Sequence, residues 1–105
     1  MVNKDKERLL FKLLRQIPPG KVVSYKSLGL ILGISPRAVG KWLHQNNDPK
    51  IPCFKVVRSD GTLATGYKFG GMEGQRARLL VDGVKFVGPR RVAKDQFFAF
   101  NFKNT

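Results

Sequence analysis

At its centre the chain reads Ile51-Pro52-Cys53-Phe54-Lys55-Val56-Val57, a stretch that holds its single cysteine and leads into a β-branched run. Without further context, a lone cysteine is most often a small buried hydrophobic residue. Here Lys50, Lys55 and Arg58 lie close to Cys53 in the sequence, and positive charge lowers the pKa of a thiol. We therefore expect a local field that favours the thiolate, which is the nucleophilic form of Cys53.

The residues before this stretch predict two helices. Over residues 4–16, apolar residues recur at i, i+3, i+4 and i+7, the spacing of one helical face, and Pro18-Pro19-Gly20 ends the pattern. A second, short helix is expected from Tyr25 to Leu32, because Ser24 can cap its start and Gly33 suits its end. Its apolar residues crowd together, so we expect it to be buried on most sides.

A third helix is expected from Arg37 to about Gln45, since Ser35 can cap it and Pro36 suits its first position. Its apolar face consists of Ala38, Val39, Trp42 and Leu43, and its outer face of Arg37, Gly40, Lys41 and His44. A short helix, a turn with a glycine and a second helix with a basic outer face are typical of the helix-turn-helix.

The second half predicts a small β-wing. Residues 54–57 and 62–65 read as two strands, and Ser59-Asp60-Gly61 between them is typical of a hairpin turn. A last helix is expected over residues 73–81, and residues 84–87 fit a further short strand. The expected fold class is therefore mainly α with a small β-wing, a winged helix-turn-helix.

We expect one DNA-binding domain over residues 1–88 and a basic aromatic C-terminal tail over residues 89–105. In this tail Phe98, Phe100 and Phe102 alternate as they would in a strand. The same composition equally suits a surface for oligomers or for nucleic acid.

The charge of the chain indicates the class of partner. Twenty Lys and Arg against seven Asp and Glu give a formal net charge of +13, which favours an acidic polymer, with nucleic acid as the first candidate. A ribosomal or merely soluble basic protein is the alternative, although eight Phe and one Trp argue against a disordered basic tail. One cysteine allows no internal disulfide, which fits a reducing compartment. No apolar run approaches the roughly 18 residues of a membrane span, and no signal peptide is evident, so we expect a cytoplasmic protein without a membrane partner.

Several motifs occur together in one order: Ile17-Pro18-Pro19-Gly20-Lys21-Val22-Val23-Ser24-Tyr25, Arg37-Ala38-Val39-Gly40, Ile51-Pro52-Cys53 with Val56-Val57, Asp60-Gly61, Gly66-Tyr67 and Leu79-Leu80. In order and spacing, over about residues 8–87, they resemble the DNA-binding, active-site domain of the O6-alkylguanine-DNA alkyltransferases, which are suicide DNA repair proteins. They equally resemble the non-enzymatic relatives of that family, the alkyltransferase-like proteins.

The resemblance implies a partner and a chemistry. The partner would be double-stranded DNA bearing O6-alkylguanine, bound through the minor groove, with the damaged nucleotide flipped into a pocket because its alkyl group is otherwise buried in the base stack. Cys53 would accept the alkyl group irreversibly, and Tyr25 would assist the departure of guanine by hydrogen bonding to the base. Asn46 matches a hinge asparagine if one residue is deleted before the Pro-Cys element. No cofactor and no metal are implied.

The resemblance also assigns binding residues. Arg37 would fill the space that the flipped base leaves, and Gly40 would let the helix backbone approach the DNA closely. The expected DNA-binding set is Ser35, Arg37, Gly40, Lys41, His44 and Tyr25. The expected substrate pocket is formed by Pro52, Val57, Tyr67 and Gly70.

Three features depart from the family pattern. Phe54 and Lys55 stand where the family usually has His-Arg, so the histidine that deprotonates the cysteine through a water is absent. The glutamate that orients this histidine is matched by Asp82, one residue earlier after the paired leucines. We also expect no counterpart of the family's separate N-terminal domain, as in the alkyltransferase-like proteins, although those usually replace the cysteine itself.

Three hypotheses remain open. Our main hypothesis is a stoichiometric methylated-DNA–protein-cysteine S-methyltransferase whose thiolate forms without a histidine. The second is a non-catalytic protein that binds and flips alkylated bases and marks them for another repair pathway, with other repair proteins as partners. The third is a winged-helix transcription regulator with an accidental cysteine.

Overall fold

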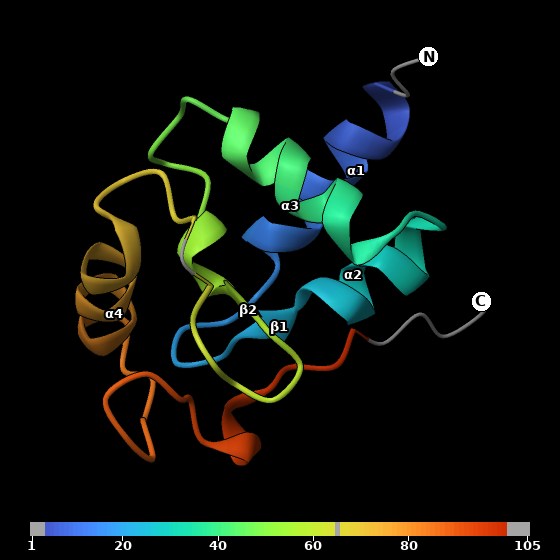
Figure 1. The fold of residues 1–105 in the computed structure, drawn as a ribbon. Helices are drawn as coiled ribbons and strands as arrows, with labels where there is room; N and C mark the ends of the chain where they lie inside the picture. The colour runs from blue at the N-terminus through green and yellow to red at the C-terminus, as the bar shows by residue number, and fades with distance from the viewer. Residues whose placement is uncertain (1–3, 65, 101–105) are drawn as a thin grey trace.

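The structure is a computed structural model that describes residues 4–64 and 66–100 (Figure 1). Its α-helices are α1 (Lys4–Arg15), α2 (Tyr25–Leu32), α3 (Pro36–Gln45) and α4 (Gly71–Val81). Two short strands, β1 (Val23–Ser24) and β2 (Val56–Val57), and two 3-10 turns, η1 (Cys53–Lys55) and η2 (Lys94–Gln96), complete the described elements. All four predicted helices are confirmed, each within two residues of the expected bounds. In the described part of the chain, no helix is long and apolar enough to cross a membrane.

Local chemistry accounts for the helix-turn-helix of α2 and α3. The Ser24 hydroxyl accepts a hydrogen bond from Ser27 N at 3.0 Å, so it caps α2 as predicted. Gly33 ends this helix with a φ of 72°, a left-handed conformation that glycine adopts without strain. The turn is tight: a Cβ on Gly29 would lie 2.6 Å from Ile34 O. The angle between α2 and α3 therefore depends on glycine at this position.

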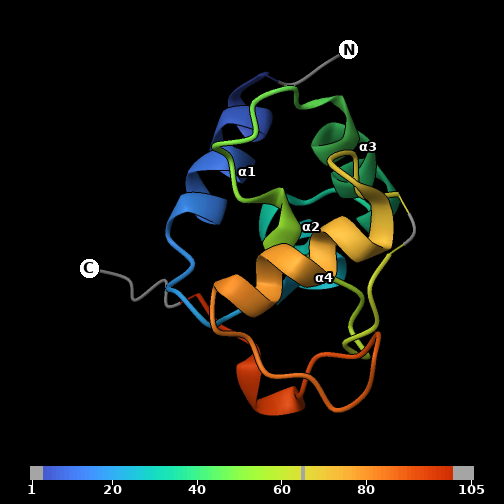
Figure 2. The same cartoon turned by 90° about the vertical axis from the view of Figure 1, so that its left-hand side faces the viewer.

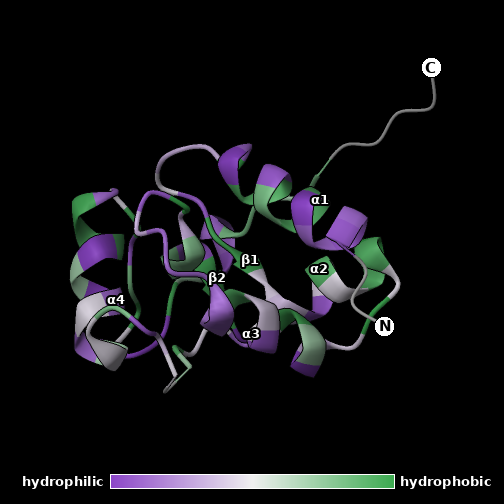
Figure 3. Cartoon of the chain, turned by 90° about the horizontal axis from the view of Figure 1, so that it is seen from above, coloured by the Kyte–Doolittle hydropathy of each residue, from purple (hydrophilic) through white to green (hydrophobic). Residues whose placement is uncertain are grey.

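The core consists of two clusters that meet at the two-stranded sheet. The first cluster packs α1, α2 and α3 together and includes Leu14, Val23 and Cys53. The second lies beneath α4 and includes Phe54 and Val57. Successive residues of β2 thus serve different clusters, as the alternation of a strand requires. Along α1, hydrophilic and hydrophobic stretches alternate, so that one side of the helix can enter the core (Figure 3).

The predicted hairpin between residues 54–57 and 62–65 is wrong over the residues that the structure describes. β2 pairs in parallel with β1, in the register Val23 with Val56 and Ser24 with Val57. Thr62 instead forms an isolated antiparallel bridge with Arg91. The physical reason is burial, because both valines of β2 are fully enclosed and pairing with β1 places them between the two clusters.

The segment after α4 returns to the core. The predicted strand over residues 84–87 is reduced to one bridge, between Phe86 and Val92. Further on, Phe97 bridges Val22 in parallel, and Val92 is almost completely buried. Phe98 and Phe100 lie outside the described strands and contact each other edge-on at 5.0 Å, whereas Phe102 falls outside the described residues.

Candidate nucleic-acid interface and cysteine cavity

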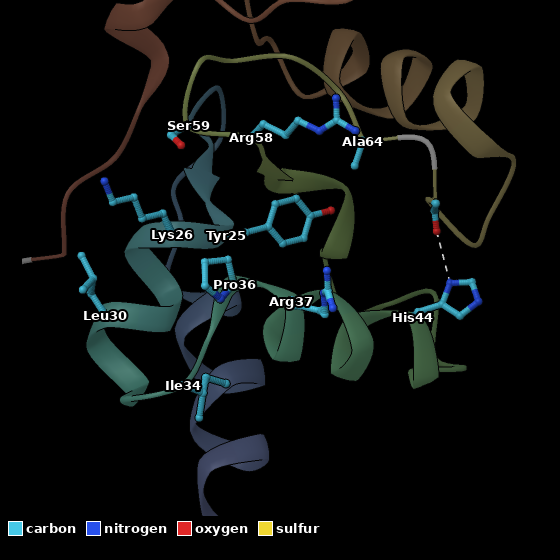
Figure 4. A pocket seen from close by; sticks show the side chains of 12 residues that line it. Tyr25, Lys26, Leu30, Ile34, Pro36, Arg37, His44, Arg58, Ser59 and Ala64 are labelled. Carbon is cyan, nitrogen blue, oxygen red and sulfur yellow. Dashed lines mark hydrogen bonds between the residues drawn. The ribbon is translucent and has the colours of Figure 1, made fainter.

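A groove of about 1020 Å³ runs between α2, α3 and the segment that follows β2 (Figure 4). Tyr25 projects into it from the start of α2, with Arg58 on one side and Arg37 on the other (Figure 4). The groove is lined by Tyr25, Lys26, Leu30, Ile34, Pro36, Arg37, Gly40, His44, Arg58, Ser59, Ala64 and Gly66. Two arginines and a lysine at an open groove form a surface that suits a phosphate backbone.

Cys53 lies at a second, much smaller cavity of about 30 Å³. The cavity is lined by Tyr25, Gly40, Leu43, His44, Cys53, Gly66, Tyr67, Lys68 and Phe69. Its lining shares Tyr25, Gly40, His44 and Gly66 with the groove, so the two spaces are neighbours along one rim. Cys53 is 7% exposed, so its thiol is largely shielded from solvent.

Asn46 holds the cysteine sulfur. Its Nδ2 donates a hydrogen bond to Cys53 Sγ at 3.5 Å and another to Asp48 O at 2.8 Å. Its Oδ1 accepts from Asp48 N at 3.1 Å, which fixes the orientation of the amide. The residue that the sequence matched to a hinge is thus a direct neighbour of the nucleophile candidate, at the end of α3.

The expectation that the local field favours the thiolate of Cys53 is wrong. Burial raises the pKa of the Cys53 thiol above its ordinary value, and the hydrogen bond from Asn46 lowers it only in part. Lys55, which the sequence places two positions away, has its ammonium group in an ion pair with Asp82 at 3.0 Å. Closeness in sequence therefore did not bring positive charge to the sulfur.

In the described part of the chain Lys55 is the one charged residue that is buried, with 4% of its surface exposed. Besides the ion pair, its Nζ donates to Ile17 O at 3.2 Å and to Pro18 O at 2.9 Å. Asp82 also accepts from Gly20 N at 2.9 Å. The three donors of the ammonium group are thereby satisfied, and the ion pair joins η1, the α1–β1 linker and the end of α4.

Phe54 packs in the second core cluster, whereas Cys53 packs in the first, and Phe54 is 7% exposed. The guanidinium of Arg78 lies over its ring, 4.8 Å from the centroid. From α4, Gln75 Nε2 donates to Phe54 O and to Val56 O, each at 2.9 Å. The turn that carries Cys53 is therefore clamped to α4, and the side chain at position 54 belongs to that packing.

Two tyrosines flank the cavity, and both keep their protons at neutral pH. Burial raises the pKa of Tyr25, which Arg58 lowers in part and Cys53 raises further. Burial likewise raises the pKa of Tyr67, with Arg78 acting in the opposite direction. Each hydroxyl is thus available as a hydrogen-bond donor toward a group in the cavity.

The structure brings together most of the residues singled out from the sequence. Asn46 donates to the sulfur of Cys53, and the cavity at this sulfur is lined by Cys53, Tyr25 and Tyr67. Gly40 and His44 line both the cavity and the groove. Arg37 lines the groove but not the cavity, and Lys41 is exposed on the same helix. Ser35 caps α3, its hydroxyl accepting from Ala38 N at 3.1 Å.

Three predicted pocket residues line neither of these two spaces in the described part of the chain: Pro52, Val57 and Gly70. Val57 is enclosed in the second cluster, and Gly70 is the N-cap of α4, with a φ of 110°. The sequence reasoning missed Leu43, Lys68 and Phe69 at the cavity and Arg58 in the groove. The one local signal for Phe69 was that it is an aromatic residue two positions after Tyr67.

The sequence of this chain matches known proteins. The family model described as "6-O-methylguanine DNA methyltransferase, DNA binding domain" matches residues 5–84. A bifunctional methyltransferase/endonuclease of Picrophilus torridus is 44% identical over 88 residues, which cover 81% of this chain and 29% of that protein. A methylated-DNA–protein-cysteine methyltransferase of Pyrobaculum aerophilum is 42% identical over 86 residues, 79% of this chain and 55% of that protein. The chain thus spans between about a third and about half of these relatives.

Two solved structures have the same fold. Atl1 of S. pombe, in complex with damaged DNA containing O6-carboxymethylguanine, superposes with a TM-score of 0.76 at 21% identity, over 94% of this chain and 99% of that one. The O6-methylguanine-DNA methyltransferase of Pyrococcus kodakaraensis gives 0.64 at 34% identity, over 74% and 46%. The predicted fold class, mainly α and of the winged helix-turn-helix type, is thereby confirmed.

Proposed function

Because the chain belongs to the family of the 6-O-methylguanine DNA methyltransferase DNA-binding domain, we propose that it repairs alkylated DNA by accepting the alkyl group on Cys53. The observation that supports this proposal is the environment of the Cys53 sulfur. Cys53 Sγ accepts a hydrogen bond from Asn46 Nδ2 at the wall of a cavity that borders a basic groove. A structural cysteine needs neither the amide donor nor the adjoining space.

The groove would receive the DNA, with α3 in the minor groove. Arg37 at the start of α3 and Arg58 opposite lie on the two sides of Tyr25 (Figure 4). A duplex held by these charges would present a flipped nucleotide to the rim between Tyr25 and His44. Arg37 would then fill the space in the base stack.

The transfer step is a displacement at the alkyl carbon. The thiolate of Cys53 attacks that carbon, the new carbon–sulfur bond forms, and the bond from the carbon to guanine O6 breaks. Guanine leaves with the bonding electrons and takes up a proton at N1, so that overall the thiol proton moves to the base. Tyr25, protonated because burial raises its pKa, donates a hydrogen bond to the base as negative charge develops there. Asn46 stabilises the thiolate before the attack.

A second function has support from a different observation. Burial raises the pKa of Cys53, and Phe54 stands where the family usually has its base, so that little thiolate forms near neutral pH. Such a site favours a protein that binds and flips the alkylated base without chemistry and leaves it to other repair proteins. Groove, cavity and tyrosines serve this function equally well.

Intact-mass spectrometry separates the two. The chain is mixed with duplex DNA carrying one O6-methylguanine, across neutral to alkaline pH, beside the Cys53→Ser variant as control. A gain of one methyl group per chain, absent in the variant, supports transfer. No gain at any pH, with selective binding to the lesion, supports the non-catalytic binder. Preference for an undamaged sequence over the lesion overturns both and leaves a transcription regulator.

A further inference from the structure

Residues 66–69 form one wall of the cysteine cavity. Gly66, Tyr67, Lys68 and Phe69 line it, as does Leu43 of α3. The rings of Tyr67 and Phe69 meet edge-on, with centroids 5.8 Å apart and planes at 67°. Two contacting aromatic rings have few rotatable bonds, so they give the cavity a stiff boundary.

On one side, this wall is anchored to α4. Gly71 N donates to Tyr67 O at 2.9 Å, which closes the turn, and Gly74 N donates to Gly70 O at 3.0 Å. A Cβ on Gly74 would lie 2.6 Å from Phe69 O, so the backbone of Phe69 rests directly on the first turn of the helix. The position of the Phe69 ring therefore follows from the position of α4.

On the other side, the wall is joined to the C-terminal end of α3. Nδ1 of His44 lies 3.2 Å from Gly66 O and can donate to it, and Lys68 Nζ donates to Asn47 Oδ1. Figure 2 shows the segment before α4 lying beside this end of α3. Held from both sides, the wall has little freedom to retreat.

The two spaces differ greatly in size. The cavity of about 30 Å³ exceeds the roughly 10–15 Å³ that a single water needs, so it has room for a group on the scale of a methyl but not for a benzyl ring. The groove of about 1020 Å³ has ample room for a nucleobase. A base at the shared rim would thus leave only its O6 substituent to enter the cavity, against Phe69.

We propose that Phe69 limits the size of the O6 substituent, so that the cavity accepts methyl and excludes groups as large as benzyl. For the identity of the base this inference rests on the proposed function. For the size limit it rests on the cavity alone. Phe69 acts here as a specificity-determining residue whose ring fills the space that a larger group would need.

The first test measures binding in a Cys53→Ser background, where no transfer can occur. Affinity is determined for matched duplexes carrying O6-methylguanine, O6-benzylguanine or guanine. We expect methyl to be preferred over benzyl at least tenfold, and Phe69→Ala to remove most of that preference by strengthening binding to benzyl. Phe11→Ala, which truncates a partly buried phenylalanine of α1, is the control for loss of packing. Phe69→Leu provides a milder variant should Phe69→Ala fold poorly.

The second test needs no DNA. The chain has one cysteine, so methyl and benzyl methanethiosulfonate both report on Cys53 by intact mass. After division by their rates with free cysteine, the methyl-to-benzyl ratio should be high in the parent chain and fall in Phe69→Ala but not in Phe11→Ala. An unchanged ratio in both tests overturns the inference. A changed reagent ratio without any preference for O6-methylguanine over guanine keeps the size limit and rejects the proposed function.

Discussion

Lys55 Nζ lies 3.0 Å from Asp82 Oδ2, and this buried ion pair fixes the turn that carries Cys53 to the end of α4. The lysine thereby serves the architecture of the site and not the ionisation of the thiol. The pair also explains why Asp82 is unavailable to orient a base beside the sulfur.

Lys55→Met should destabilise the chain by about 3 kcal/mol, because it leaves the Asp82 carboxylate partly buried without its counter-ion. Urea unfolding followed by circular dichroism measures this loss. The double variant Lys55→Met, Asp82→Leu should recover much of it, since no unpaired charge remains. A single variant as stable as the parent would show that the pair contributes nothing.

Asn46→Ala should slow the reaction of Cys53 with iodoacetamide at neutral pH. The lost hydrogen bond, about 1 kcal/mol, corresponds to a roughly fivefold smaller thiolate fraction. At a pH where the thiol is fully ionised, the two rates should converge. Asn46→Asp keeps an acceptor for Asp48 N but replaces the donor with a carboxylate, so it should raise the pKa of Cys53 further. Equal rates for all three proteins would contradict a role for Asn46 at the sulfur.

The free energy of unfolding should fall as the pH rises into the alkaline range. The pKa values of Cys53, Tyr25 and Tyr67 are all raised in the folded chain, so the folded state binds more protons than the unfolded state there. The stability is complete below the unfolded pKa of the thiol, about 8.5, and is lost as the pH passes upward through the raised value. Urea titrations from neutral to alkaline pH measure the slope. Cys53→Ser and Tyr25→Phe should each flatten it, and an unaltered slope in both would refute the assignment.

Phe54→His should not restore a base to Cys53. The side chain at position 54 packs in the second core cluster beneath Arg78, and Asp82 is already paired with Lys55. We expect no gain in the rate at which Cys53 reacts near neutral pH, and a loss of stability of about 1–3 kcal/mol from burying an imidazole. Phe54→Leu, which stays apolar, is the control. A rate that rises near neutrality more than at high pH would show that the imidazole reaches the sulfur.

Arg37→Ala should weaken binding to DNA carrying O6-methylguanine and reduce the fluorescence increase of a 2-aminopurine reporter beside the lesion. Arg8→Ala removes the same charge from the exposed surface of α1 and should leave the reporter signal intact. For both variants, a plot of the logarithm of affinity against the logarithm of salt concentration should have a negative slope of roughly 0.9 for each phosphate that the protein neutralises. If the Arg37→Ala variant still gives the full fluorescence increase, another residue supports flipping.

The helices could be predicted because their signals are local. Ser24 and Ser35 cap them through hydrogen bonds to residues three positions on, and Gly33 ends α2 as its flexibility suggests. The β part could not, because the partner of Val56 is decided by burial between two clusters that only the folded chain defines.

The site divides in the same way. Cys53, Tyr25 and Tyr67 were predicted from a motif, and the structure places all three at one cavity. The direction in which the pKa of Cys53 shifts and the position of Phe69 could not be predicted, since each depends on contacts between distant elements. Sequence distance told nothing about where the ammonium group of Lys55 would point.

The parallel pairing of β1 with β2 also bears on the order in which the chain folds. The entire helix-turn-helix lies between Val23 and Val56, so this pairing closes a long loop, whose entropic cost is met only after local structure has formed. The α2–α3 unit can form early, whereas the turn that holds Cys53 reaches its place late, together with β2. A newly made or partly unfolded chain therefore presents an accessible thiol of ordinary acidity, open to oxidants and electrophiles, and folding itself protects the sulfur.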